Sequence, residues 1–184
     1  MNKFIFAFLA FLFLSATNVN AQAPSYTDFE WDILRLGYAI PGGVDGISSG
    51  VSAGSEVRYN LKDEISVGFR FEGAVYGTDF DSTTDIDVGV AASFALMGDY
   101  YFNTESSKRA FAGFGIGYFE GASLEVSGST GSADAGSSIG LIPRVGYELG
   151  HLRLSAEYNL AFGEGVPSYI GIQLGITLFG GYDG

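Results

Sequence analysis

Apolar and polar residues alternate with a period of two along most of the chain. In the segment 169–179, for example, Ile170, Ile172 and Leu174 occupy every second position, and Gly or a polar residue stands between them. Because successive side chains of a strand point to opposite faces, each such segment is predicted to be a two-faced strand. Eight strands are predicted, at residues 31–40, 50–61, 65–76, 87–102, 110–121, 138–149, 151–162 and 169–179.

Long and short connections alternate between these strands. The long ones are 41–49, 77–86 and 122–137, the short ones are 62–64 and 150, 103–109 is intermediate, and 163–168 is modest. The Gly/Ser-rich run 127–138 is predicted to be a mobile outer loop. Bacterial barrels have an even number of strands, short periplasmic turns and longer outer loops. We therefore predict an all-β fold, an eight-stranded antiparallel up-and-down transmembrane β-barrel with both termini in the periplasm.

The N-terminus has the pattern of a secretory signal peptide. Lys3 is followed by an apolar run at 4–14 and by small and polar residues that end at Ala21. The run falls short of the ~20 residues that a membrane-spanning helix needs. We predict a signal peptide at 1–21, a mature start at Gln22 and a barrel domain at 22–184.

Composition excludes several kinds of chemistry. The chain has no Cys, so a disulfide framework, a thiolate nucleophile and a cysteine zinc site are excluded. Without the predicted leader, eight basic residues stand against 21 acidic ones, which argues against nucleic-acid binding. No cofactor is expected.

If the aliphatic positions face lipid, a set of charged residues must face the interior of the barrel. The set comprises Arg35, Glu56, Arg58, Arg70, Glu72, Asp99, Arg144, Glu148, Arg153 and Glu157. The lumen of an eight-stranded barrel is just wide enough for side chains to fill, so these five cations and five anions are predicted to pair and plug it. A gated conduit or a proton path is the alternative. The glycines of the string Gly113, Gly115, Gly117 are predicted to make room for large neighbours, because no helix follows to form a nucleotide loop.

Aromatic residues are predicted to form two girdles at the membrane interfaces, although strands also favour aromatic residues for other reasons. The periplasmic girdle would comprise Trp31, Tyr59, Tyr100, Phe102, Tyr147 and Phe179. The outer girdle would comprise Tyr38, Tyr118, Phe119, Tyr158, Phe162 and Tyr169.

A run of alternate aspartates, Asp79, Asp81, Asp85 and Asp87, is a weak candidate for a metal site. It lacks the Gly and the closing Glu of an EF-hand, so a solvated loop is favoured over a specific calcium site. Divalent ions shared with lipopolysaccharide phosphates are a third possibility.

In these features the chain resembles the small eight-stranded outer-membrane β-barrel family, which includes the OmpA-like transmembrane domain and OmpX-type proteins. The last strand resembles their C-terminal assembly signal at Tyr169, Gly171, Leu174 and Ile176, but five residues follow Phe179. The resemblance implies location in the outer membrane of a Gram-negative-type bacterium. It implies as partners outer-membrane lipid, lipopolysaccharide and the barrel assembly machinery, and it allows a surface ligand or an envelope protein as a further partner.

The sequence favours a structural or surface-interaction protein with a plugged polar interior. The alternative is narrow porin-like or OmpW-like transport of small solutes or hydrophobic molecules, for which Phe119 and Ile142 are the main inward apolar residues of the outer half. Catalysis is disfavoured, and no catalytic residue is assigned. The single histidine, His151, lies at a predicted periplasmic turn, and four residues along a strand separate it from Ser155 by ~13 Å.

Overall fold

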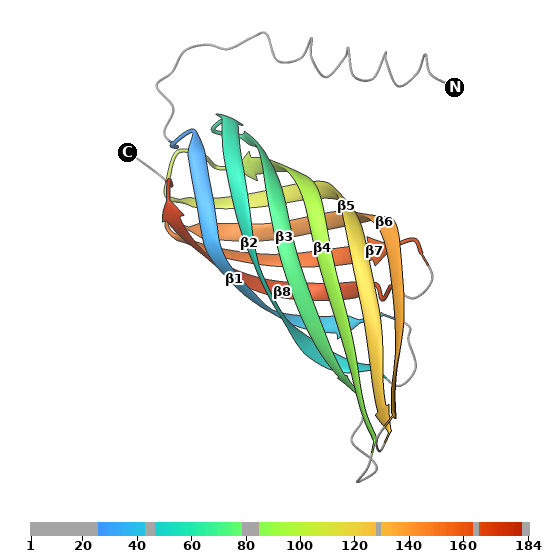
Figure 1. Cartoon of the computed structure of the whole chain (residues 1–184). Helices are drawn as coiled ribbons and strands as arrows, with labels where there is room; N and C mark the ends of the chain where they lie inside the picture. Colours follow the sequence, from blue (N-terminus) through green and yellow to red (C-terminus); the bar gives the residue numbers. More distant parts are fainter. Residues whose placement is uncertain (1–25, 43–46, 79–84, 128–129, 164–165, 182–184) are drawn as a thin grey trace, which may run out of the picture.

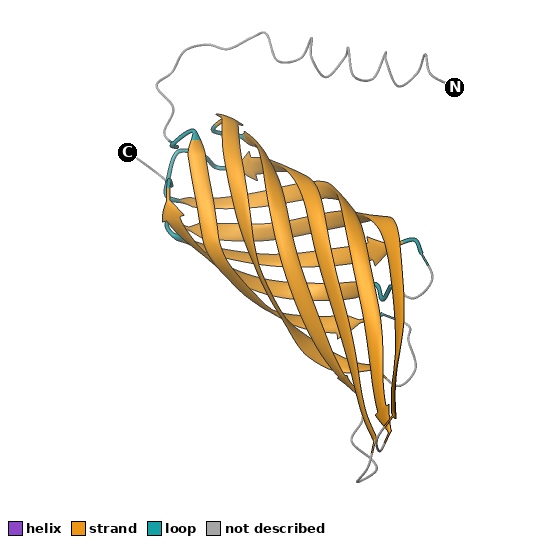
Figure 2. Cartoon of the chain, in the orientation of Figure 1, coloured by secondary structure: helices purple, strands orange, loops and turns teal. Residues whose placement is uncertain are grey.

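The computed structural model describes residues 26–42, 47–78, 85–127, 130–163 and 166–181, and these form a closed barrel of eight antiparallel strands (Figures 1 and 2). The strands are β1 (Phe29–Pro41), β2 (Ile47–Lys62), β3 (Ile65–Thr78), β4 (Asp85–Phe102), β5 (Lys108–Ser127), β6 (Thr130–Leu149), β7 (Leu152–Ala161) and β8 (Tyr169–Phe179). The predicted all-β, up-and-down architecture is confirmed. The predicted leader lies outside the described residues. Within the described ranges, no helix has the length and apolarity to cross a membrane.

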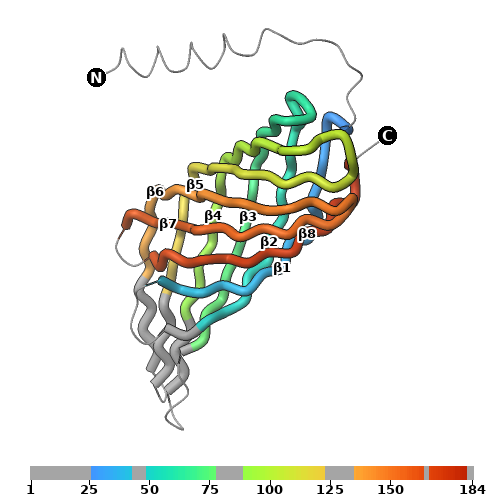
Figure 3. The backbone as a smooth tube through the Cα atoms, turned by 180° about the vertical axis from the view of Figure 1, so that it is seen from behind, coloured from blue at the N-terminus to red at the C-terminus, as the bar shows by residue number. Residues whose placement is uncertain are grey.

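Each strand pairs with its neighbour in the chain, and β1 pairs with β8 to close the sheet, from Trp31 opposite Phe179 to Pro41 opposite Tyr169. Seen from behind, β6, β7, β8 and β1 lie side by side and complete the wall (Figure 3). Closure satisfies the backbone hydrogen bonds between strands without leaving a free sheet edge along the shared length of the barrel.

The two ends of the barrel differ. At the end that we name the termini end, the backbone of Thr27 donates to the carbonyl oxygen of Gly181 (3.1 Å), and the connections β2–β3, β4–β5 and β6–β7 are short. The opposite end, the loop end, carries the other connections and is uneven. There, β6 begins to pair with β7 only at Gly140, opposite Ala161, so the first part of β6 extends beyond β7.

The prediction of a loop over 122–137, mobile over 127–138, is wrong for most of that range. β5 continues to Ser127, and β6 pairs with it from Thr130 onward. Gly and Ser have low strand propensity, but the ladder is formed by backbone groups. The neighbouring strand β4, paired with β5 as far as Asp85, extends the template along which the hairpin continues.

Apolar side chains cover the outside of the barrel, and charged side chains fill its interior. Leu96, Val51 and Phe162 are 69%, 65% and 63% exposed, whereas Arg70 is 0% exposed. Soluble proteins rarely display apolar surface on this scale. The distribution is the one expected of a barrel that is surrounded by hydrocarbon.

The prediction for the outer girdle is wrong at two positions. Phe119 and Tyr169 are 1% and 2% exposed and point into the barrel. Each shares its parity with an inward glycine two residues away, Gly117 or Gly171, and alternation therefore places it inside. The remaining predicted girdle members are exposed, apart from Trp31, which is half-buried and stacks on Phe179 with ring centroids 6.0 Å apart.

A β-bulge in β1 changes the parity of the inward positions. The register with β2 shifts between Asp32 and Arg35, and Ile33 and Leu34 both lie outside, each 41% exposed. Before the bulge the even positions Glu30 and Asp32 are buried, and after it the odd position Arg35 is buried. The extra residue of a bulge has this effect on a strand of period two.

Candidate functional site

Thirteen charged side chains of the described residues are buried in the barrel. They include all ten residues of the predicted lumen set: Arg35, Glu56, Arg58, Arg70, Glu72, Asp99, Arg144, Glu148, Arg153 and Glu157. Three more belong with them, Glu30, Asp32 and Arg109, so that seven carboxylates face six guanidinium groups. We name these thirteen side chains the lumen network. Isolated charges would be very unfavourable in so dry a space, and each of them has an ion-pair partner.

Arg144 of β6 lies at the centre of the lumen network. It donates from Nη1 and Nη2 to the two carboxylate oxygens of Glu56 on β2, at 2.8 and 2.6 Å. The same guanidinium donates from Nε and Nη2 to Asp99 of β4, at 2.8 and 2.7 Å. Arg153 adds a bond of 2.6 Å to Asp99, and Arg35 a bond of 2.5 Å to Glu56. Strands from opposite walls are thus joined through one planar, five-donor group.

A second layer lies toward the termini end. Glu30 accepts from Arg58 and from Arg109, each at 2.8 Å, and Arg109 Nε donates to Glu148 at 2.5 Å. Arg58 also binds Asp32, which places the residue before the bulge in the same layer. This layer connects β1, β2, β5 and β6.

Two tyrosines enclose Arg109 at the termini end. Its guanidinium carbon lies 3.5 Å from the centroid of the Tyr26 ring and 3.6 Å from that of the Tyr101 ring. The Tyr26 hydroxyl donates to the backbone oxygen of Ser106 at 2.5 Å. Tyr26 precedes β1 and is 3% exposed, so the segment before the first strand covers this end of the lumen.

The third layer lies toward the loop end. Glu157 of β7 binds both Arg35 and Arg70, and Arg70 donates to Asn159 at 2.6 Å. Glu72 is held differently, because its nearest guanidinium nitrogen, on Arg70, is 3.7 Å away. It accepts instead from the Tyr169 hydroxyl at 2.5 Å and from Gln173 Nε2 at 3.0 Å.

Apolar side chains fill the lumen between these layers and the loop end. One cluster consists of Ala95, Met97, Phe119, Ile142 and Val166, the last from the β7–β8 connection. A second cluster consists of Ala39, Ala74, Tyr76, Ala91 and Tyr169. Phe119 and Ile142 are therefore inside, as predicted, and are packed among neighbours.

The glycine string of β5 makes room for these side chains, as predicted. A Cβ at Gly113 would collide with Asp99 and crowd Arg144, and one at Gly115 would collide with Met97. The β5 wall can therefore approach the ion pairs and the apolar cluster closely. No nucleotide-binding loop is formed, since β5 continues as a strand.

The structure assembles no catalytic or metal constellation among the residues that it describes. His151 is exposed at the β6–β7 turn, and its carbonyl oxygen accepts from the backbone of Thr177 at 2.8 Å. No group of three or more His, Cys, Asp or Glu in the described ranges is placed to hold a metal ion. Of the aspartate run, Asp79 and Asp81 lie outside the described residues. Asp85 and Asp87 belong to β4, where the structure describes their backbone but not their side chains.

Three residues of the lumen network were not predicted from the sequence. If β1 had no bulge, every second residue before Arg35 would face inward, and Glu30 and Asp32 would face outward. The bulge at Ile33 and Leu34 turns both side chains into the lumen, and the sequence alone does not show it. Arg109 was assigned to a turn, although β5 begins at Lys108. Its parity with the inward Phe111 was the available signal.

No protein-family model matches the chain, and no curated protein matches it. Solved structures of the same fold do. The chain is similar to Ail, the attachment invasion locus protein of Yersinia pestis, at 13% identity and a TM-score of 0.53 over 86% of this chain and 98% of that one. It is similar to Neisserial surface protein A at 17% identity and a TM-score of 0.55, over 82% and 97% of the two chains.

The outer membrane protein OprG of Pseudomonas aeruginosa is similar at 14% identity and a TM-score of 0.53, over 86% of this chain and 97% of that one. At these identities the likeness shows a shared fold. The fold is that of the small eight-stranded outer-membrane barrels, and the resemblance expected from the sequence is confirmed at that level.

Proposed function

We propose that the protein is an integral outer-membrane protein whose barrel is plugged by the lumen network and whose acidic loop end contacts cationic partners at the membrane surface. The single observation that carries the proposal is the reversed distribution of side chains, with exposed aliphatic residues outside and thirteen buried charges inside. Lipid hydrocarbon stabilises such an outer surface, and ion pairs stabilise such an interior.

The lumen network supports a closed interior over a conduit. Arg144, Glu56 and Asp99 are bonded across the middle of the barrel, and Phe119 and Ile142 pack on the loop-end side of them. A conducting path needs mobile water along the axis, whereas the guanidinium groups here are held by several acceptors each. The barrel therefore serves as an anchor, and function is assigned to the ends.

The sequence of the loop end is acidic throughout. The strand ends and connections of this end, 42–49, 77–87, 120–137 and 163–168, contain nine Asp and Glu residues and no Lys or Arg. A structure of Ail similar to this one, at 16% identity and a TM-score of 0.51, contains the heparin analogue sucrose octasulfate. A polyanion of that kind would be repelled here, and a cationic surface would be attracted.

The experiment compares two ligands on the full chain in lipid nanodiscs. A lysine oligopeptide is expected to bind with an affinity that falls as salt rises, and sucrose octasulfate is expected not to bind. Replacing Asp79, Asp81, Asp85 and Asp87 with Asn should weaken oligopeptide binding, whereas Glu64→Gln at the termini end should not. Equal binding of both ligands, or failure of the chain to enter lipid at all, would overturn the proposal.

A second candidate function is passage of small hydrophobic molecules, which the apolar cluster around Phe119 and Ile142 in the loop half favours. Liposomes containing the protein would then take up a small aromatic solute such as indole faster than empty liposomes. Phe119→Ala would change that rate, and the exposed substitution Leu96→Ala would serve as the control. We assign no catalytic role.

A further inference from the structure

One edge of the sheet is open at the loop end, along the first part of β6. β6 pairs with β5 from Thr130 onward, but its ladder with β7 begins only at Gly140, opposite Ala161 (Figure 1). The segment 130–139 therefore has a strand on one side and, among the described residues, no paired strand on the other.

The described part of the chain after β7 leaves β6 near Ser137. A Cβ built at Gly163 would lie 3.1 Å from the backbone oxygen of Ser137, so the chain still runs beside β6 at this point. Val166 is already back in the lumen, in the apolar cluster that contains Phe119. The segment 131–135 lies beyond this contact, and we name it the β6 edge.

Two observations identify the residues whose backbone groups face the open side. Phe162 donates to the backbone oxygen of Ile139 at 3.2 Å, so the odd-numbered residues of β6 direct their peptide groups away from β5. At Pro143 the ladder with β7 lacks its pairs, while the ladder with β5 is complete. Proline has no N–H, so the loss on the β7 side gives the same parity. Because the register with β5 has no shift, the open positions of the β6 edge are Gly131, Ala133 and Ala135.

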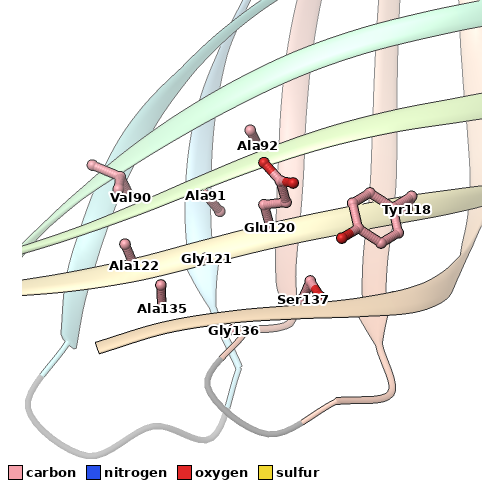
Figure 4. A pocket seen from close by; sticks show the side chains of 10 residues that line it. All are labelled: Val90, Ala91, Ala92, Tyr118, Glu120, Gly121, Ala122, Ala135, Gly136 and Ser137. Carbon is pink, nitrogen blue, oxygen red and sulfur yellow. The ribbon is translucent and has the colours of Figure 1, made fainter. Parts of the chain in front are cut away.

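The β6 edge lies outside the hydrocarbon layer. Ile139 is exposed and apolar, whereas the next outward residues toward the loop end, Ser137 and Ala135, are exposed and small (Figure 4). Ala135 lies ~13 Å beyond Ile139 along the strand, which is ~10 Å along the membrane normal at a strand tilt of ~40°. An open sheet edge is not tolerated in hydrocarbon, which agrees with this placement. The free peptide groups therefore face the polar phase, where a partner can reach them.

The β6 edge lacks the devices that usually protect an open edge, which are Lys, Pro and β-bulges. The sequence 130–136 contains no Lys and no Pro, and its ladder with β5 has no bulge. Its residues are Gly, Ala, Ser, Thr and one Asp, so no long side chain obstructs a strand that approaches in the plane of the sheet. Such an edge accepts an extended peptide, which pairs with the free backbone groups.

Charge indicates which peptide is attracted. The strand ends and connections of the loop end carry acidic residues and no Lys or Arg. A second copy of the chain would bring the same acidic sequence to the edge and would be repelled. The described ends of the same chain, Tyr26 and Gly181, lie at the termini end and are remote from it. A cationic segment of another protein fits both the free backbone groups and the charge.

We propose that the β6 edge binds an extended, cationic polypeptide segment as an added strand, paired with the backbone of Gly131, Ala133 and Ala135. The inference rests on the proposed function, and it names the class of partner and the groups that hold it. It adds main-chain hydrogen bonds to the attraction between opposite charges.

The test separates main-chain pairing from charge. The full chain in lipid nanodiscs is titrated with a hexapeptide of alternating lysine and threonine, and with the same peptide methylated on every backbone nitrogen. The two peptides have the same charge, but the methylated one has no backbone N–H to donate. The unmethylated peptide is expected to bind about tenfold more tightly, since each hydrogen bond contributes a several-fold factor.

Hydrogen exchange of the same sample locates the bound peptide. In the free chain the N–H groups of Gly131, Ala133 and Ala135 should exchange rapidly, whereas those of Ser132 and Asp134 are held in the ladder with β5 and should exchange slowly. At saturation the unmethylated peptide should slow the first set by about tenfold and leave the second set unchanged.

Variants of one residue supply a matched comparison. Ala135→Pro removes an edge N–H and no hydrogen bond to β5, because position 135 has the parity of Pro143. It should weaken binding of the unmethylated peptide about fivefold, the size of one hydrogen bond, and leave the methylated peptide unaffected. Ala135→Thr keeps the N–H and should bind as the parent does. Ala133→Pro has the same expected effect and serves if Ala135→Pro does not fold.

Equal binding of the two peptides, or edge N–H groups that are already protected in the free chain, would overturn the inference and leave the attraction of cationic partners in place. Protection that rises with the number of chains per nanodisc, without any peptide, would also overturn it, in favour of a second copy. If neither peptide binds, or if the chain does not enter lipid, the proposed function itself is refuted, so the two failures are distinguishable.

Discussion

Arg144 on β6 donates two hydrogen bonds, of 2.8 and 2.6 Å, to Glu56 on the opposite wall of the barrel. A bidentate pair of this kind fixes the distance and the orientation of two strands that are not neighbours in the sheet. Because Arg144 also binds Asp99 on β4, one side chain holds three strands around the axis. The plug and the register of the wall therefore depend on the same contacts.

Replacing Arg144 with Met should lower the free energy of unfolding by about 3–5 kcal/mol, because Glu56 and Asp99 would remain buried without their main cation. Urea unfolding in lipid, followed by the fluorescence of the single tryptophan, Trp31, measures this. The double variant Arg144→Met, Glu56→Gln should recover part of the loss, since one stranded charge is then removed. A loss below about 1 kcal/mol in the single variant would contradict the role given to Arg144.

The bulge in β1 should be essential for folding. Deleting Ile33 would shift Glu30 and Asp32 to outward positions and bring Trp31 inward, so two carboxylates would face lipid and Arg58 would lose two partners. We expect little or no folded barrel, measured as the heat-modifiable band of the folded form on gels. An added Gly in the connection 43–46, which leaves every strand in register, is the matched control. Normal folding of the Ile33 deletion would refute this role of the bulge.

Gly113 should tolerate no side chain. A Cβ there would meet Asp99 and crowd Arg144, so Gly113→Val is expected to destabilise the barrel by about 1–3 kcal/mol through overpacking. Gly98→Ala is the control, because its Cβ would find only ordinary contacts, the nearest at 3.9 Å. Urea unfolding of the two variants should separate them clearly, and equal stability would show that the β5 wall can move outward.

Tyr26 should contribute to closing the termini end. Tyr26→Ala removes the ring that lies against Arg109 and the hydrogen bond to the Ser106 carbonyl oxygen. Loss of the cation–π contact alone should lower the free energy of unfolding by about 0.5–2 kcal/mol. Tyr26→Phe keeps the ring and should lose only about 1 kcal/mol, the contribution of a hydrogen bond. If both variants unfold at the parental urea concentration, the segment before β1 is not part of the stable structure.

Alternation alone predicted much of the architecture, because side-chain direction in a strand is a geometric property of the backbone. β8 has the predicted bounds, and Arg35, Glu157 and the other members of the predicted lumen set lie inside. Tyr169 and Phe119 were assigned by their aromatic character to a girdle. Each lies two residues from an inward glycine, Gly171 or Gly117, on the same strand, and alternation therefore predicts that its side chain points inward.

The remaining features depend on pairing, which a single sequence does not display. Whether Ile33 and Leu34 form a bulge is decided by the register with β2 and β8. The strand character of 130–138 comes from the ladder with β5, against the weak propensity of its Gly and Ser residues.

Single-channel conductance in planar lipid bilayers tests the closed lumen most directly. The parent should be silent, because Glu157 is bonded to both Arg35 and Arg70 and so closes the lumen between them. Arg70→Ala or Glu157→Ala should produce measurable conductance by leaving a gap and a free charge, and Ser93→Ala beside Arg70 should stay silent. Large, steady conductance of the parent would contradict the plug and favour a transport protein.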